Sequence, residues 1–200
     1  INFYKDKIKS SSILTELNLT KNNFFLASIH REENINSENF LKIVEILNTL
    51  EKKFNLPIIV STHPRTRAKI DSSKYKFSKN IRFLKPHSFS NYINLQINSK
   101  AVLSDSGTIN EESSILNFPA LNLREAHERP EAMEETSVIL TGVNCERIIQ
   151  ALEILSQQKR GRNRDLKLVN DYNVDNVSEK ILRIIISYTD YIKRKIWKEY

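Results

Sequence analysis

Residues 101–112 read AVLSDSGTINEE, so that a short apolar run leads directly into hydroxyl side chains, one glycine and two glutamates. The apolar residues are typical of a buried strand, and the residues from Ile109 onward are typical of a helix. Backbone N–H groups in the first turn of a helix lack intrahelical acceptors and lie at the positive end of the helix dipole. This junction is therefore suited to bind an anion such as a phosphate group.

Glycine is scarce, which makes its place in this stretch informative. The 200 residues include three glycines, and Gly107 lies where a ligand would need the backbone at close range. Ser106 and Gly107 also fit an ordinary helix cap, and Thr108-x-x-Glu111 matches a capping box. Glu112 is not needed for such a cap, and it could accept hydrogen bonds from the ribose hydroxyls of a nucleotide.

The order of strand followed by helix repeats along the whole chain. Apolar runs alternate with segments of helical period, which predicts an α/β fold with a parallel sheet. We expect strands at 24–29, 58–61, 81–84, 101–103, 120–123 and 138–140, and helices near 40–50, 89–97, 109–116, 144–156, 174–186 and 188–200. The polar residues 157–170 are interpreted as a linker, which divides the chain into a Rossmann-like domain at 1–170 and a helical segment at 171–200.

Unusual polar side chains follow the carboxyl ends of five predicted strands. These segments are residues 30–34, 63–65, 86–87, 105–107 and 124–131. Because the carboxyl ends of parallel strands share one edge, the five segments should converge on a ligand-binding crevice. His30 could be an acid, a base, a partner of a phosphate or a structural residue, and His63 and His87 are weaker candidates. Arg129 offers a fork for a diphosphate or a surface ion pair, so the set supports a nucleotide without naming a reaction.

Composition argues against several other classes of protein. The net charge of +7 comes from 31 basic and 24 acidic residues, but the basic residues are spread over many segments without the aromatic alternation of RNA-binding motifs. We therefore expect a solvated basic surface and no nucleic-acid partner. Cys145 is the only cysteine, which excludes an intrachain disulfide, and the histidine spacing predicts no metal site.

The first residues and the longest apolar runs bear on location. Residues 1–7 lack the apolar core of a signal peptide, and no run has the length needed to cross a bilayer. We expect a cytoplasmic protein with no membrane partner. The chain also lacks an initiator methionine, which indicates an excised piece of a longer protein.

Four motifs, taken in their order and spacing, point to a known family. HREEN (30–34), HP (63–64), DSGTINEE (105–112) and ERPE (128–131) resemble the motifs of the non-hydrolysing UDP-N-acetylglucosamine 2-epimerases, over nearly the whole chain. That family has two Rossmann-like domains of the GT-B kind facing across a cleft, and this chain is similar to the second, UDP-binding domain. The resemblance implies the N-terminal catalytic domain of the same enzyme as a partner, a homodimer, and no redox cofactor or metal.

The motif variants, together with residues 172–180 and 188–200, are most similar to the capsule and O-antigen branch, which makes UDP-N-acetyl-L-fucosamine for surface polysaccharides. The resemblance implies inversion of C2 in a UDP-linked 2-acetamido sugar by anti elimination of UDP and re-addition. The substrate would be UDP-N-acetylglucosamine, with UDP-N-acetylmannosamine as product, or UDP-2-acetamido-2,6-dideoxy-L-talose. A GT-B glycosyltransferase and a non-catalytic UDP-sugar-sensing module are the competing interpretations.

The family pattern also assigns roles to individual residues. It implies His30 as the catalytic group, Glu112 on the ribose and the backbone near Tyr92 on uracil. The substrate-binding residues on the phosphate side would be Arg31, Ser106, Gly107, Thr108 and Arg129. Thr108 replaces a second glycine of the family, which removes one flexible backbone position. The carboxylates that move the C2 proton belong to the other domain, so this chain alone should not epimerise.

Overall fold

The computed structural model describes residues 1–35, 38–72 and 75–199. The chain divides into two compact units, Ile1–Val169 and Asn170–Tyr200, which are described separately. The predicted end of the last helix, Tyr200, lies outside the described residues.

Unit 1 is built on a six-stranded parallel sheet. Its strands are β1 (Phe25–Ser28), β2 (Ile58–Ser61), β3 (Ile81–Leu84), β4 (Val102–Ser104), β5 (Ala120–Asn122) and β6 (Ile139–Leu140). Their order in the sheet is β3-β2-β1-β4-β5-β6, and every neighbouring pair is parallel. The six predicted strands and the predicted α/β class are confirmed. Because strand order reverses between β1 and β4, the crevice outside their carboxyl ends is the expected ligand position.

Helices connect the strands and continue into unit 2. They are η1 (Asn2–Tyr4), α1 (Lys5–Lys9), α2 (Ile13–Glu16), α3 (Glu32–Ile35), α4 (Asn39–Phe54), α5 (Pro64–Ser72), α6 (Phe89–Asn98), α7 (Ile109–Leu116), α8 (Pro130–Glu134), α9 (Cys145–Leu155), η2 (Asn170–Tyr172), α10 (Val177–Ile192) and η3 (Lys193–Trp197). Local chemistry fixes several starts: Ser88 and Asn144 accept hydrogen bonds from first-turn amides of α6 and α9, and Pro130 opens α8.

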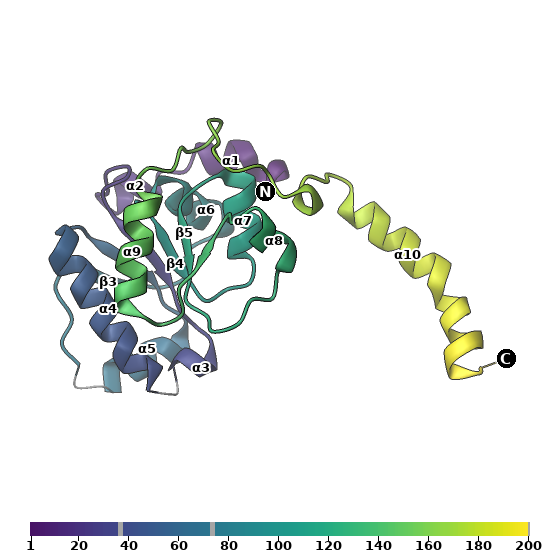
Figure 1. Ribbon diagram of the computed structural model, residues 1–200, viewed down its shortest axis with the longest axis horizontal. Coiled ribbons are helices and arrows are strands. Elements are labelled where there is room, and N and C mark those ends of the chain that lie inside the picture. The colour runs from purple at the N-terminus through teal and green to yellow at the C-terminus, as the bar shows by residue number, and fades with distance from the viewer. Residues whose placement is uncertain (36–37, 73–74, 200) are drawn as a thin grey trace. The chain divides into compact units, whose positions relative to one another are not determined.

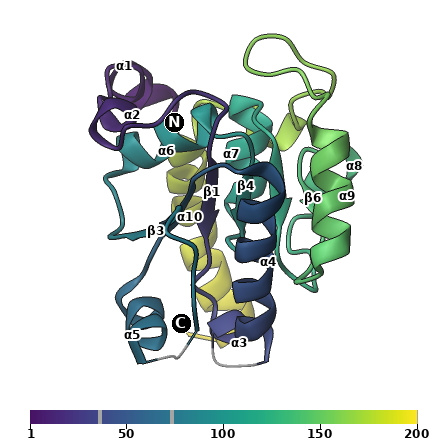
Figure 2. The same ribbon diagram turned by 90° about the vertical axis from the view of Figure 1, so that its left-hand side faces the viewer.

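The two faces of the sheet carry separate apolar clusters. Figures 1 and 2 show α4 and α9 together on one side, with α6 and α7 on the other. Along β1, Phe25 and Ala27 pack in the cluster with residues of α4 and α9, whereas Leu26 packs in the cluster with residues of α6 and α7. Because both faces are covered, the strands are continuously apolar rather than alternating.

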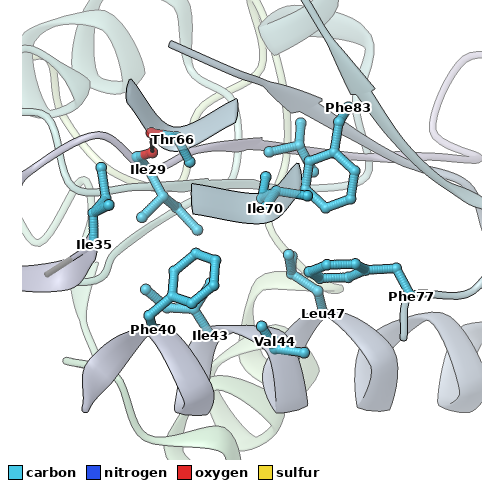
Figure 3. A pocket seen from close by; sticks show the side chains of 11 residues that line it. Ile29, Ile35, Phe40, Ile43, Val44, Leu47, Thr66, Ile70, Phe77 and Phe83 are labelled. Carbon is cyan, nitrogen blue, oxygen red and sulfur yellow. Dashed lines mark hydrogen bonds between the residues drawn. The ribbon is translucent and has the colours of Figure 1, made fainter. Parts of the chain in front are cut away.

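An apolar cavity of about 20 Å³ remains where α4 meets the sheet. Figure 3 shows Phe40, Ile43 and Leu47 of α4 facing Ile29 and Phe83 across it. A space of this size holds at most one water molecule, and its lining offers almost no polar partner for one. The cavity is therefore a packing gap and not a ligand site.

The structure corrects two predictions about the C-terminal part of the chain. Residues 157–169 are not a linker, because Arg160 donates to the carbonyl oxygen of Ser99 at 2.7 Å and Arg164 donates to that of Ser114 at 2.7 Å. The predicted break near residue 187 is also wrong. Helix α10 runs through Tyr188 into the π-helical turn η3, and no Gly or Pro interrupts this stretch.

The sequence analysis also missed five short helices, namely α1, α2, α3, α5 and α8. In the part of the chain that the structure describes, no helix combines the length and the apolar character needed to span a bilayer.

Candidate functional site

A buried carboxylate at the end of β4 organises the candidate site. Asp105 is 0% exposed, and it accepts hydrogen bonds from the backbone amides of His30 (3.1 Å) and Arg31 (3.0 Å). It also accepts one from the side-chain amide of Asn34 at 3.1 Å. These bonds join the carboxyl ends of β1 and β4, so Asp105 fixes the loop that carries His30 and Arg31.

The same carboxylate orients the imidazole of His30. Nδ1 of His30 lies 3.3 Å from Oδ1 of Asp105, and the histidine side chain is 47% exposed. In a neutral imidazole this contact places the proton on Nδ1 and leaves Nε2 as an acceptor. The arrangement gives His30 a fixed orientation together with access to a ligand.

Three arginines gather beside the start of α7. Arg31 approaches both carboxylate oxygens of Glu128, at 3.5 and 3.3 Å, and the buried Arg124 binds the same carboxylate. Arg129 pairs through Nε with Glu111 at 2.8 Å. The hydrogen bond from Arg124 is the largest cause that lowers the pKa of Glu128 to about 2, and the charges of Arg124 and Arg31 add to it.

Gly107 lies directly beneath this charged cluster. A Cβ atom at Gly107 would stand 3.5 Å from Oε2 of Glu128 and 3.7 Å from Nη2 of Arg129. The hydroxyls of Ser106 and Thr108 lie 3.1 Å apart in the same turn. The predicted capping box is wrong, because Thr108 makes no side-chain cap and Glu111 binds Arg129 instead.

A second polar group extends from this turn along α7. Oε2 of Glu112 accepts a hydrogen bond from Nε2 of the fully buried Gln96 at 2.5 Å, and the Thr108 hydroxyl also hydrogen-bonds Glu112. Burial raises the pKa of Glu112, while these two hydrogen bonds oppose the shift. Burial also raises the pKa of the neighbouring Tyr92 to about 12.

The structure thus brings most of the predicted site residues into two adjoining groups. The first holds His30, Arg31, Ser106, Gly107, Thr108 and Arg129, and the second holds Tyr92 and Glu112. His87 lies elsewhere, near Glu16 of the N-terminal helices, and burial lowers its pKa. His63 is exposed beside a groove of about 740 Å³ whose lining includes Pro64 and Pro86.

Sequence reasoning gave no separate role to four residues of these groups, Asp105, Arg124, Glu128 and Gln96. Asp105 and Glu128 stood inside recognised motifs, but nothing local distinguishes a buried anchor from a surface acid. Arg124 and Gln96 are buried, which is unusual for their residue types and visible only in the fold. Among the described residues, no cluster of His, Cys, Asp or Glu has the arrangement of a metal site.

Comparison with known protein families identifies a match over most of the chain. The family model described as UDP-N-acetylglucosamine 2-epimerase matches residues 1–186. A curated relative from Methanocaldococcus jannaschii named UDP-N-acetylglucosamine 2-epimerase is 34% identical over 167 residues, which cover 81% of this chain and 44% of the relative. A Campylobacter jejuni protein of the same name is 32% identical, over 88% of this chain and 46% of the relative.

Solved structures give the same result. The UDP-N-acetylglucosamine 2-epimerase from Rickettsia bellii superposes with a TM-score of 0.86 at 42% identity, over 99% of this chain and 53% of that one. The Methanocaldococcus jannaschii enzyme in complex with UDP-GlcNAc and UDP superposes with a TM-score of 0.78 at 30% identity, over 91% of this chain and 50% of that one. The likeness confirms the predicted fold class, a Rossmann-like parallel sheet of the GT-B type.

Proposed function

The chain belongs to the UDP-N-acetylglucosamine 2-epimerase family, and on that premise we propose that it supplies the UDP-binding half of an enzyme that inverts C2 of a UDP-linked 2-acetamido sugar. The observation that carries this proposal is the carboxylate of Glu128, which lies among arginines over Gly107 where a diphosphate oxygen would bind. A site that already holds one anionic group this way is suited to hold another.

The chain spans about half the length of the curated relatives it matches. We propose that it corresponds to the C-terminal domain and that an N-terminal domain of the same enzyme closes the cleft. That other domain contributes the carboxylates that remove and return the C2 proton. The 200-residue chain alone should then bind UDP weakly, if at all, and show no turnover. Any measurable epimerisation by this chain alone would contradict the proposed division between the two domains.

The proposed role of the anion site follows from the chemistry of the leaving group. UDP must stay bound while its bond to C1 breaks, so groups that hold the diphosphate contribute most where negative charge develops. Ser106, Gly107 and Thr108 offer the first turn of α7, and Arg31 and Arg129 offer guanidinium groups. Binding of the diphosphate displaces the Glu128 carboxylate from Arg31 and the Glu111 carboxylate from Arg129.

The remaining groups are assigned to the nucleoside and the sugar. Glu112, one helical turn beyond Thr108, accepts the ribose hydroxyls, and the backbone near Tyr92 contacts uracil. His30, oriented by Asp105, acts as the catalytic group next to the sugar and the phosphates. We expect His30→Ala in the complete enzyme to lower turnover far more than substrate affinity, and the reverse pattern would contradict the catalytic role.

Within the family, the variants HREEN, DSGT and ERPE support the branch that produces UDP-N-acetyl-L-fucosamine for surface polysaccharides. The decisive experiment is proton NMR in deuterated water with the full-length protein that contains this chain. UDP-N-acetylglucosamine and UDP-2-acetamido-2,6-dideoxy-L-talose are tested separately. Deuterium at C2 of an inverted product establishes the reaction, and the sugar that reacts identifies the branch.

The other outcomes point to the competing functions. If neither sugar exchanges although UDP binds, the epimerase proposal fails. Transfer of the sugar to an added acceptor would then indicate a glycosyltransferase, and binding without any transfer would indicate a UDP-sugar-sensing protein. Sedimentation of the same sample tests the homodimer.

A further inference from the structure

We propose that Gln96 is a positioning residue that holds the carboxylate of Glu112 for the ribose hydroxyls of the nucleotide. The inference rests on the proposed function, because it concerns the nucleoside part of the same site. Neither the motifs nor the family resemblance assigned Gln96 a role.

The geometry places Gln96 behind the carboxylate. Nε2 of Gln96 donates to Oε2 of Glu112 at 2.5 Å, across the contact between α6 and α7. The Thr108 hydroxyl, four residues earlier on the same face of α7, also hydrogen-bonds this carboxylate. A carboxylate has about four lone-pair positions, so two donors from the protein leave acceptor capacity for two ligand hydroxyls.

The electrostatics explain why such support is needed. Burial disfavours the charged form of Glu112, and the hydrogen bonds from Gln96 and Thr108 favour it. An ionised carboxylate only accepts hydrogen bonds, which suits the two hydroxyl donors of a ribose. The amide of Gln96 therefore both directs the carboxylate and helps to keep it charged.

A packing role alone does not account for Gln96. The side chain is 0% exposed, its Oε1 has no hydrogen-bond partner of ordinary geometry within residues 1–35, 38–72 and 75–199, and the side chain also interacts with the Tyr92 hydroxyl. Burying an unpaired polar atom is unfavourable, and a leucine of similar size would fill the same space without that penalty. The amide is explained by the carboxylate that its nitrogen binds.

The position of Glu112 along α7 agrees with the shape of a nucleotide. Glu112 lies five residues after Gly107 and three residues after Ile109, the first residue of α7. It is therefore about one helical turn, or about 5.4 Å, from the start of the helix. In a nucleoside diphosphate the ribose directly follows the phosphates. A carboxylate one turn from the phosphate end is thus at the right place to meet the ribose.

The test compares UDP with 2′,3′-dideoxy-UDP, which lacks both ribose hydroxyls, by calorimetric titration of the full-length protein that contains this chain. The unmodified protein should bind UDP about tenfold or more tightly than the dideoxy compound. In Gln96→Leu this preference should fall to about twofold or less, mainly through weaker UDP binding. In the background of Glu112→Gln, adding Gln96→Leu should change the preference no further, because both changes remove one interaction.

Asn94→Leu is the matched control, because it removes another buried amide from α6, one that donates to the carbonyl oxygen of Ile8 at 2.8 Å. This variant should lose stability and keep the full preference for UDP. Should Gln96→Leu fold poorly, Gln96→Met removes the same amide with a more adaptable side chain.

Two results would overturn the inference. Equal weakening of both ligands in Gln96→Leu or Gln96→Met, with the preference preserved, would show a purely structural role. An unmodified protein that binds both ligands equally would show that no carboxylate reads the ribose. An unmodified full-length protein that binds neither ligand would instead refute the proposed UDP site itself, and the inference with it.

Discussion

Two carboxylates of the candidate site hold their loops in different ways. Asp105 is fully buried, and besides the His30 imidazole it is bound by three neutral amides, two of them in the backbone. Glu128 is 45% exposed, and it is held by the side-chain cations Arg31 and Arg124. Backbone amides can leave Asp105 only if the loop that carries them changes conformation. The arginine side chains can leave Glu128 by rotating and can then bind another anion. Asp105 is therefore the fixed part of the site, and Glu128 is its exchangeable part.

The largest expected effect comes from neutralising the fixed carboxylate. Asp105→Asn turns an acceptor into a donor facing the amides of His30 and Arg31, so we expect a loss of about 2–4 kcal/mol in the free energy of unfolding. Urea denaturation measures this loss. The matched control is Asp71→Asn, which removes an exposed pair with Arg67 and should cost less than about 0.5 kcal/mol. Equal urea midpoints for Asp105→Asn and Asp71→Asn would show that Asp105 stabilises the fold no more than an exposed carboxylate does.

The next largest effect is expected at Gly107, which lies beside Glu128 and Arg129. In Gly107→Ala the new methyl group would make ordinary contacts, 3.5 Å or more from Glu128 and Arg129, so the melting temperature should change by less than about 2 °C. The methyl group would occupy the approach to the α7 amides, so we expect UDP affinity to fall about tenfold. Calorimetric titration measures that affinity. Unchanged binding would place the diphosphate elsewhere.

A smaller effect of opposite sign is expected for the exchangeable carboxylate. Glu128→Gln removes a negative charge that competes with the ligand, so affinity for inorganic pyrophosphate should rise about two- to fivefold. Glu134→Gln is the control, because it makes the same charge change at an exposed position of α8 outside the cluster. Weaker binding in Glu128→Gln would mean that Glu128 organises the arginines for the ligand rather than occupying its place.

The smallest effect is a dependence of stability on pH. The neighbouring guanidiniums hold the pKa of Glu128 at about 2, below the ordinary value of 4.5, so its stabilising contribution is present above pH 4.5 and lost between pH 4.5 and 2. The melting temperature of Glu128→Gln should lie slightly below that of the unmodified chain at pH 6. The two should converge near pH 2, and parallel curves throughout would argue against the ion pairs.

The strands were predictable because their signal is local. Short apolar runs such as Ile58–Ser61 are bounded by turn residues, and a strand buried on both faces needs nothing more to be recognised. The short helices α1 to α3 carry too few residues for a helical period to be visible. The segment 157–169 was misread for another reason. Its polar residues bind backbone carbonyls of unit 1, and composition does not distinguish such a segment from a solvated one.

The site was predictable to the extent that it lies in motifs. DSG and ERPE placed Gly107 and Arg129 at one edge of the sheet, and the fold brings them within contact distance. Gln96 and Arg124 carry no such signal. Their importance comes from burial beside Glu112 and Glu128, which depends on packing between segments far apart in the sequence.

The two ends of helix α7 face groups of opposite charge, and these groups are synthesised at different times during translation. Its start faces the anion site, while the carbonyl groups at its end are held by Arg164, 50 residues later than Ser114. On a ribosome that adds about 5–20 residues per second, this partner arrives roughly 3–10 s after the helix itself. During that interval the C-terminal end of α7 lacks its cation. The start of α7 is therefore synthesised several seconds before the arginine that holds the carbonyl groups at its end.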